Sequence, residues 1–200
     1  MNYPRHLAAC LLGLLFCSAC LADETIVMVR HGEKPEQGLG QLNCQGLNRS
    51  LALPAVLQKK FDRPAAIFAP NPGIQKSDRG QLYNYIRPLA TIEPTAIALE
   101  LPVNTQYGLE DIDHLQTALL APAYQEATIL VAWEHHLLEQ AARKLLAENG
   151  GNPAVVPLWD EHDYDSIYII TVTSHADGKR SASFRHEVEG LNLLPTTCPK

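Results

Sequence analysis

Residues 25–35 read Thr-Ile-Val-Met-Val-Arg-His-Gly-Glu-Lys-Pro. The first five, Thr25 to Val29, are apolar or β-branched without interruption, which predicts a strand buried on both faces of a sheet. Arg30 and His31 follow directly, so we expect them at the carboxyl end of that strand. Ligands bind at the carboxyl ends of strands in open α/β sheets. The stretch therefore predicts both a largely parallel sheet and the place of a site.

A second stretch has the same design. Residues 128–133 form another apolar run, and Glu134, His135 and His136 follow it. If the two strands are parallel neighbours, His31 and His135 lie side by side with Arg30 close by. One arginine and two imidazoles make a cationic pocket that suits a phosphate, which arginine binds bidentately. A neutral imidazole can also attack phosphorus, although the residues alone leave this as one option among several.

The remaining patterns alternate between strand and helix. They predict an α/β fold, a three-layer α/β/α sandwich whose mostly parallel sheet has an antiparallel hairpin near the C-terminus, in a single domain over residues 23–200. Residues 73–85 are expected to be a polar loop. We expect Pro54 either to kink the first helix or to start a new segment, and Pro94 to interrupt the second helix. The predicted strands are 65–69, 102–105, 166–172 and 181–188, and the predicted helices are 45–61, 87–99, 109–120 and 137–148.

Composition excludes several classes of protein. Of 200 residues, 46% are hydrophobic and 19% charged, which excludes a disordered chain, and there are no repeated long apolar runs of a multi-span membrane protein. Lys and Arg number 16 against 22 acidic residues, giving a net charge of −6. A broadly basic nucleic-acid surface is therefore not expected. The partner expected from the cationic pocket is a small phosphorylated molecule.

The N-terminal residues 1–22 have the pattern of a secretory signal. Leu7 to Cys17 is apolar and uncharged, and small residues follow it up to Ala22, after which cleavage is expected. A second interpretation makes Cys20 the acceptor of a lipid anchor. Both interpretations predict an exported protein, periplasmic or secreted.

The cysteines are informative once the signal is set aside. Three of the five cysteines lie within residues 1–22, which leaves Cys44 and Cys198. An exported chain with two distant cysteines favours one disulfide between them, tying the C-terminal tail to the body of the protein. The alternative is two unpaired thiols.

Four segments together resemble the histidine phosphatase superfamily, the phosphoglycerate-mutase-like proteins. Val-Arg-His-Gly-Glu-Lys-Pro at residues 29–35 resembles the signature of that family. In the expected order, residues 42–46 resemble its Leu-Thr-x-x-Gly helix start and residues 87–91 its Arg-Ala-x-Gln-Thr segment. Residues 131–136 resemble the strand that carries its second active-site histidine. The resemblance covers most of residues 25–190.

The resemblance implies a role for each matched position. His31 is the nucleophile, Arg30 and Arg87 bind the phosphate, and His135 donates hydrogen bonds to the phosphoryl oxygens and stabilises the transition state. Neither a metal nor a cofactor is implied, because two arginines and an imidazole supply the positive charge. The implied activity is phosphomonoester hydrolysis through phosphohistidine. The alternatives are a phosphomutase and a non-catalytic phospholigand-binding envelope protein.

The proton donor is the point where this sequence departs from the family pattern. Some members use an Asp directly after the second histidine, but His136 stands there. Others use a Glu after the second arginine, which here predicts Glu110, with Asp111 as the alternative. Either acid could instead be a helix N-terminal residue. Glu33, Glu134 and water also stay open as donors.

Three further polar residues stay open at this stage. Lys76 and Arg79 in the 73–85 segment are candidates for binding a second anionic group of the substrate. A metal site that joins His162 to Glu134 or His135 is disfavoured, because the spacing matches no standard zinc pattern.

Overall fold

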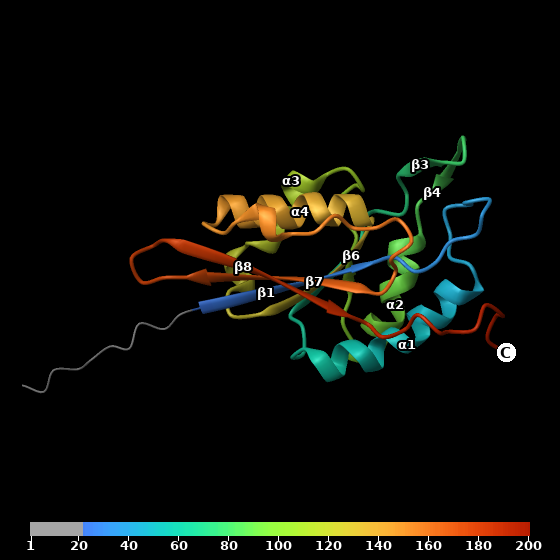
Figure 1. The fold of residues 1–200 in the computed structure, drawn as a ribbon, viewed down its shortest axis with the longest axis horizontal. Coiled ribbons are helices and arrows are strands. Elements are labelled where there is room, and N and C mark those ends of the chain that lie inside the picture. Colours follow the sequence, from blue (N-terminus) through green and yellow to red (C-terminus); the bar gives the residue numbers. More distant parts are fainter. Residues whose placement is uncertain (1–21) are drawn as a thin grey trace, which may run out of the picture.

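The computed structural model describes residues 22–200 of the chain (Figure 1). Residues 1–21, which hold most of the predicted signal segment and the candidate lipid-anchor residue Cys20, lie outside the described residues. Within residues 22–200 no helix is both long and apolar enough to cross a membrane.

A six-stranded sheet forms the centre of the fold, in the order β5-β2-β6-β1-β7-β8. The first four strands in that order are parallel, while β7 runs antiparallel to β1 and β8 antiparallel to β7. The predicted mixed sheet with a C-terminal hairpin is confirmed. The strands are β1 (Ala22–Arg30), β2 (Ala66–Phe68), β5 (Val103–Asn104), β6 (Thr128–Trp133), β7 (Ser166–Ser174) and β8 (Arg180–Val188).

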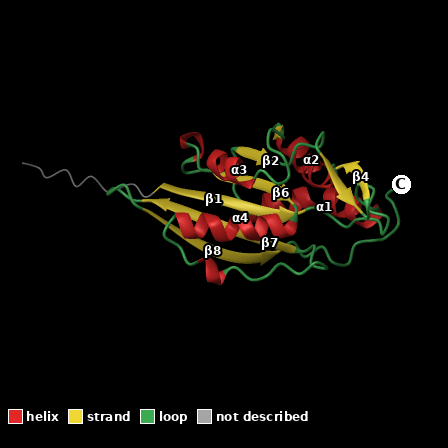
Figure 2. Cartoon of the chain, turned by 90° about the horizontal axis from the view of Figure 1, so that it is seen from above, coloured by secondary structure: helices red, strands yellow, loops and turns green. Residues whose placement is uncertain are grey.

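Helices cover both faces of this sheet, which confirms the three predicted layers (Figures 1 and 2). Each face has its own buried apolar cluster, because alternate residues of β1 and β6 point to opposite sides. One face carries α1 (Cys44–Lys60) and α2 (Arg87–Leu99), and the other carries α3 (Ile112–Leu119) and α4 (His135–Glu148). Short 3₁₀ turns lie at Pro122–Tyr124 and Pro153–Val155.

Two details differ from the sequence prediction. The expected polar loop 73–85 is a hairpin of β3 (Gln75–Asp78) and β4 (Gln81–Asn84), closed by Arg79 and Gly80 at φ of 52° and 82°. The strands of the hairpin contain a single aliphatic residue, the exposed Leu82, so the sequence shows no alternation of apolar residues there. Pro94 does not interrupt α2, and Pro54 lies within a continuous α1. Packing against the sheet outweighs the low helix propensity of both prolines.

The C-terminal tail is fixed to the start of α1. Cys44, the first residue of that helix, forms a disulfide with Cys198 across 154 residues of sequence. One turn further along, the Asn48 side-chain amide donates to the backbone carbonyls of Pro195 and Thr197. This is the pairing that the cysteine count favoured, and it closes a loop containing most of the described chain.

Candidate active site

The carboxyl ends of β1 and β6 form the floor of the candidate site. The two strands are parallel neighbours with Arg30 opposite Trp133, and the His31 amide donates to the Trp133 carbonyl at 3.0 Å. His31 and Glu134 therefore leave the sheet side by side. A cavity of about 150 Å³ opens there, lined by Arg30, His31, Lys34, Lys76, Ser77, Asp78, Tyr85, Arg87, Glu134 and His135. The structure thus brings together the two arginines and two histidines singled out in the sequence.

Close packing of backbone fixes the segment that follows His31. Gly32 and Gly46 face each other, and a Cβ added at Gly46 would lie 2.4 Å from the Glu33 carbonyl oxygen. Asn43 caps α1 by accepting from the Gly46 amide at 2.9 Å. On the other side, the Gly32 amide donates to the Thr91 hydroxyl, which itself donates to the Arg87 carbonyl. These contacts leave His31 little freedom of position.

His31 is held as a neutral imidazole with one defined tautomer. Its Nδ1 lies 2.8 Å from the Gly32 carbonyl oxygen, which can only accept, so Nδ1 carries the proton and Nε2 has the free lone pair. Burial and the nearby Arg87 and Arg30 charges hold the pKa of His31 well below its usual value. Nε2 is therefore available as a nucleophile at neutral pH.

Arg30 is anchored by one of its terminal nitrogens. Its Nη1 donates to the backbone carbonyls of Asp160, Glu161 and Asp163 at 3.2, 2.7 and 2.8 Å, and the Tyr164 ring stacks 3.9 Å from the guanidinium carbon. Its Nε is buried and has no hydrogen-bond partner among residues 22–200.

Arg87 is anchored in the same manner. Its Nη1 donates to Asp78 Oδ2 at 2.5 Å and to the Gly38 carbonyl at 3.4 Å, and the Tyr85 ring lies 4.5 Å from its guanidinium carbon. Its Nε is likewise buried and, within the described chain, unpartnered. The Nε–Nη2 edge of each guanidinium is therefore not used by the described residues. This edge can bind an oxyanion through two parallel hydrogen bonds.

Glu134 and His135 complete the cavity at the start of α4. Glu134 Oε2 caps the helix by accepting from the Leu137 amide at 3.0 Å. Burial alone would raise the pKa of Glu134, but His135 and the amides of Leu137 and His136 lower it to about 2. His135 Nδ1 lies 2.7 Å from Glu134 Oε1, yet neither ring nitrogen makes a hydrogen bond of normal angle to the described residues.

Three buried nitrogens of this cavity lack a partner in the described chain: Arg30 Nε, Arg87 Nε and His135 Nε2. An unpaired buried donor costs about 1–3 kcal/mol, and more when it is charged. A tetrahedral anion in the cavity would pair donors from all three side chains at once. The arrangement is therefore suited to binding a phosphoryl group above His31 Nε2.

One group of residues could also offer ligands to a metal ion. Within residues 22–200, ligand atoms of Glu134, His135 and His136 lie within 4.8 Å of one another. They are consecutive residues, the His135 and His136 rings stack at 3.9 Å, and Glu134 already caps the helix. His162 is not part of this group, because its charged contacts are to Asp160 and Glu161.

The structure places Glu110 and Asp111 outside the cavity. Both line a separate hollow beside Ile74 and Gly108. The Glu110 side chain is 73% exposed and lies 3.6 Å from Lys76 Nζ, while Asp111 pairs with His114 at the start of α3. Asp78 does line the cavity, although the sequence pattern predicts it in a polar loop. The Arg79-Gly80 turn is the signal that could have revealed its hairpin.

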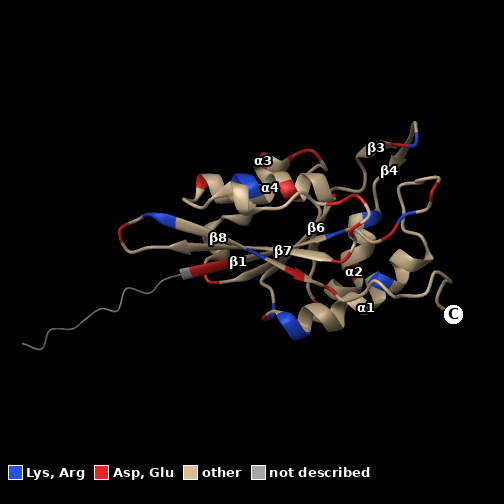
Figure 3. Cartoon of the chain, viewed as in Figure 1, with Lys and Arg blue, Asp and Glu red and all other residues tan. Residues whose placement is uncertain are grey.

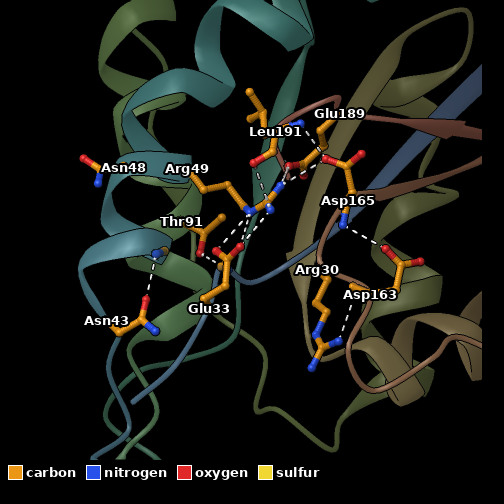
Figure 4. Close-up of polar contacts among 12 residues, drawn as sticks. Arg30, Glu33, Asn43, Asn48, Arg49, Thr91, Asp163, Asp165, Glu189 and Leu191 are labelled. Atoms are coloured by element: carbon orange, nitrogen blue, oxygen red, sulfur yellow. Dashed lines mark hydrogen bonds and ion pairs between the residues drawn. The ribbon is translucent and has the colours of Figure 1, made fainter. Parts of the chain in front are cut away.

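A buried ionic cluster around Arg49 lies next to the site (Figure 4). The fully buried guanidinium of Arg49 pairs with Glu33 at 2.8 Å, Asp165 at 3.3 Å and Glu189 at 2.5 Å. It thus joins the segment after His31 to the start of β7 and the end of β8. The neighbouring Asp163 accepts from the Asp165 amide, and the Asp163 carbonyl is one of those that hold Arg30. We call Glu33, Arg49, Asp165 and Glu189 the Arg49 cluster.

The Arg49 cluster predicts a pH effect on stability. Burial, with Asp165 and Glu33 nearby, raises the pKa of Glu189 to about 8 against the opposing Arg49. Because the folded state holds a proton that the unfolded state releases above its ordinary pKa near 4.5, stability falls as pH rises from about 4.5 to about 8. The free energy of unfolding is measured in urea across this pH range. Its decrease should be smaller by about 1–3 kcal/mol in Glu189→Gln than in the unchanged protein.

The control for this measurement is Glu187→Gln. Glu187 lies on β8, two residues before Glu189, and is paired at the surface with Lys60 and Arg185. It should leave the slope as in the unchanged protein. Glu24, whose pKa burial raises to about 7, contributes a fall of the same sign, so some slope should persist in Glu189→Gln. Identical pH profiles for Glu189→Gln and the unchanged protein would show that Glu189 titrates normally.

Comparison with known proteins places the fold. No family model matches the chain, and no curated protein matches it in sequence. Three solved structures resemble it: a protein named as phosphohistidine phosphatase SixA from Nakamurella multipartitia, a phosphoglycerate mutase from Plasmodium falciparum, and a mycobacterial glucosyl-3-phosphoglycerate phosphatase with inorganic phosphate. Their TM-scores are 0.55, 0.51 and 0.50, and their sequence identities 14%, 14% and 16%.

The three alignments cover 82%, 89% and 81% of this chain, and 96%, 98% and 95% of the respective neighbours. These structural neighbours are histidine phosphatase superfamily members. At such low identity the likeness establishes the fold and leaves the chemistry to be argued from the residues of this chain.

Proposed function

We propose that this chain is a metal-independent phosphomonoesterase that acts through a phosphohistidine on Nε2 of His31. The observation that carries the proposal is the neutral, oriented imidazole of His31 beneath buried, unpaired nitrogens of Arg30, Arg87 and His135. The proposed substrate is a small phosphorylated molecule, because the cavity is only about 150 Å³.

The geometry supports a two-step displacement. The phosphoryl oxygens bind the Nε–Nη2 edges of Arg30 and Arg87 and the His135 ring, which offset the charge that builds up in the transition state. His31 Nε2 attacks phosphorus in line as the bond to the leaving oxygen breaks. Water then attacks the phosphohistidine and releases phosphate, which restores neutral His31.

Location outside the reducing cytosol, in the periplasm or the medium, belongs to the same proposal. Its support is the Cys44–Cys198 disulfide together with the apolar stretch of residues 7–17. Mass spectrometry of the exported protein would show which residue begins the mature chain and whether Cys20 carries lipid.

The proposed function is tested by hydrolysis of p-nitrophenyl phosphate with the purified protein. We expect turnover that EDTA leaves unchanged and that vanadate, a mimic of pentacoordinate phosphorus, inhibits. Abolition by EDTA would mean that a bound metal ion is needed for the reaction. Tight phosphate binding without turnover would favour a phospholigand-binding protein, and activity only after priming by a phosphorylated cofactor would favour a phosphomutase.

A further inference from the structure

The leaving oxygen of a phosphomonoester needs a proton as its bond to phosphorus breaks. Two carboxylates of the described chain line the cavity, those of Asp78 and Glu134. The sequence pattern favours neither of them as the proton donor, since it points to Glu110 or Asp111. The choice between them can be made from their contacts.

Glu134 is already committed to structure. Its Oε2 caps α4 through the Leu137 amide, and its Oε1 lies against His135 Nδ1. Both of its carboxylate oxygens are therefore engaged. Tyr85 also lines the cavity, but burial raises its pKa to about 12, too high for an efficient acid near neutral pH.

Asp78 has one oxygen held and one oxygen free. Oδ2 accepts from Arg87 Nη1 at 2.5 Å and from the Gly40 amide at 3.4 Å, while Oδ1 makes no hydrogen bond to the described residues. The carboxyl group rests on Gly38, where an added Cβ would lie 2.4 Å from Asp78 Cγ. The side chain is therefore fixed in place and 8% exposed, and Asp78 lines the cavity with its Oδ1 unpaired in the described chain.

The β3–β4 hairpin brings Asp78 to the lining of the cavity. In-line attack puts the leaving oxygen on the far side of phosphorus from His31, which is itself buried. Strands β3 and β4 stand away from the body at the end of the molecule where β1 and β6 finish (Figure 1). Acidic and basic residues gather on the loops of that same end (Figure 3). Asp78 thus approaches the cavity from a different element than His31 and His135.

We propose that Asp78 is the proton donor to the leaving oxygen and, in the second step, the base that takes a proton from the attacking water. This rests on the proposed function. In the first step the His31–phosphorus bond forms, the phosphorus–oxygen bond breaks, and the Asp78 proton passes to the departing alkoxide. In the second step water adds to phosphorus, its proton passes to Asp78, and the bond to His31 breaks.

The charges around Asp78 explain why it would gain a proton when substrate binds. In the free protein Arg87, the Gly40 amide and Lys34 keep the pKa of Asp78 below its usual value, against the effect of burial. A phosphoryl dianion on the other edge of Arg87 sets two negative charges near the same carboxylate, and like charges raise a carboxyl pKa. Binding of substrate therefore promotes protonation of the acid that acts on it.

The test compares two substrates in Asp78→Asn, a variant of the same shape. For an alkyl phosphate, whose alcohol is a poor leaving group, kcat/KM should fall at least ~100-fold. For p-nitrophenyl phosphate, whose acidic phenol leaves without a proton, kcat/KM should fall less than about tenfold, because this constant reports the first step. Binding of inorganic phosphate should be retained or tightened, since Asp78→Asn removes a negative charge.

Two variants make the result specific to Asp78. Asp177→Asn, on the exposed β7–β8 turn, should behave as the unchanged protein with both substrates. Glu110→Gln, which removes the acid favoured by the sequence, should not separate the two substrates. An equal loss for both substrates in Asp78→Asn, or loss of phosphate binding, would overturn the proposal and make Asp78 only an anchor for Arg87. So would a separation of substrates in Glu110→Gln.

The same assays keep the two proposals apart. An unchanged protein that hydrolyses neither substrate would overturn the proposed function, and the role of Asp78 with it. An unchanged protein that hydrolyses both, with an Asp78→Asn variant that does not separate them, would overturn the role of Asp78 alone.

Discussion

Replacing His31 by alanine should reduce kcat for p-nitrophenyl phosphate by roughly 10⁴-fold or more while phosphate still binds. The reason is that Nε2 of His31 supplies the bond to phosphorus, whereas the arginine edges and the His135 ring that hold the anion remain in place. Steady-state kinetics measures the loss, and calorimetric titration with inorganic phosphate measures the binding. Binding within about tenfold of the unchanged protein separates lost chemistry from lost folding.

His162→Ala is the matched control for His31→Ala, because that histidine is exposed and contacts only Asp160 and Glu161 through charge. It should leave kcat and phosphate binding unchanged. Residual activity above about a tenth in purified His31→Ala would contradict nucleophilic catalysis by this residue. It would instead make His31 an accessory group in a cavity whose attacking species is water.

Replacing Arg49 by methionine should cost about 3–5 kcal/mol of the free energy of unfolding, the range found when one partner of a buried ion pair is removed. In the unchanged protein the Arg49 guanidinium satisfies atoms of Glu33, Asp165 and Glu189. Arg49→Met would leave these three carboxyl groups buried together with no positive charge among them. Urea unfolding followed by circular dichroism measures the change. Protonation of the carboxylates should recover part of the loss at low pH.

Arg185→Met is the control for Arg49→Met, since Arg185 is an exposed residue of β8 whose ion pair is to Glu187. Surface pairs contribute about 0–1 kcal/mol, so this variant should unfold nearly as the unchanged protein does. A loss below about 1 kcal/mol in Arg49→Met would show that the Arg49 cluster does not hold the segment after His31 to the sheet. A loss of stability with undiminished turnover would show that it does not position the site.

Much of the fold could be predicted because its signals are local. The apolar runs at residues 25–29 and 128–133 predict buried strands. If these strands are parallel, the residues that follow them lie at the same edge of the sheet, and the pairing of β1 with β6 shows that they do. Register then explains why His31 and His135 meet. Arg87 was found through resemblance to a family segment rather than through any local pattern, and the structure brings it to the same cavity.

What the sequence could not predict depends on contacts between distant segments. The β3–β4 hairpin shows no alternation of apolar and polar residues, so the sequence predicts a loop at Asp78. Its contact with Arg87 is visible only in the structure. Nothing in the sequence shows that the backbone carbonyls of Asp160, Glu161 and Asp163 anchor Arg30. Glu110 is predicted as the proton donor only because its spacing resembles that of the family's Glu. In the structure it lies at an exposed turn before α3, where no packing directs its charged side chain toward the cavity.

The measurement that tests the central claim most directly is identification of the covalent intermediate. The protein is mixed with labelled substrate, stopped in alkali, where the nitrogen–phosphorus bond survives, and digested for mass spectrometry. We expect up to one phosphoryl group per chain, on His31, with the phosphorus resonance of the Nε2 isomer, because Nδ1 is bound to the Gly32 carbonyl. Turnover with no phosphoryl group trapped on His31, or with the label on another residue, would contradict the account.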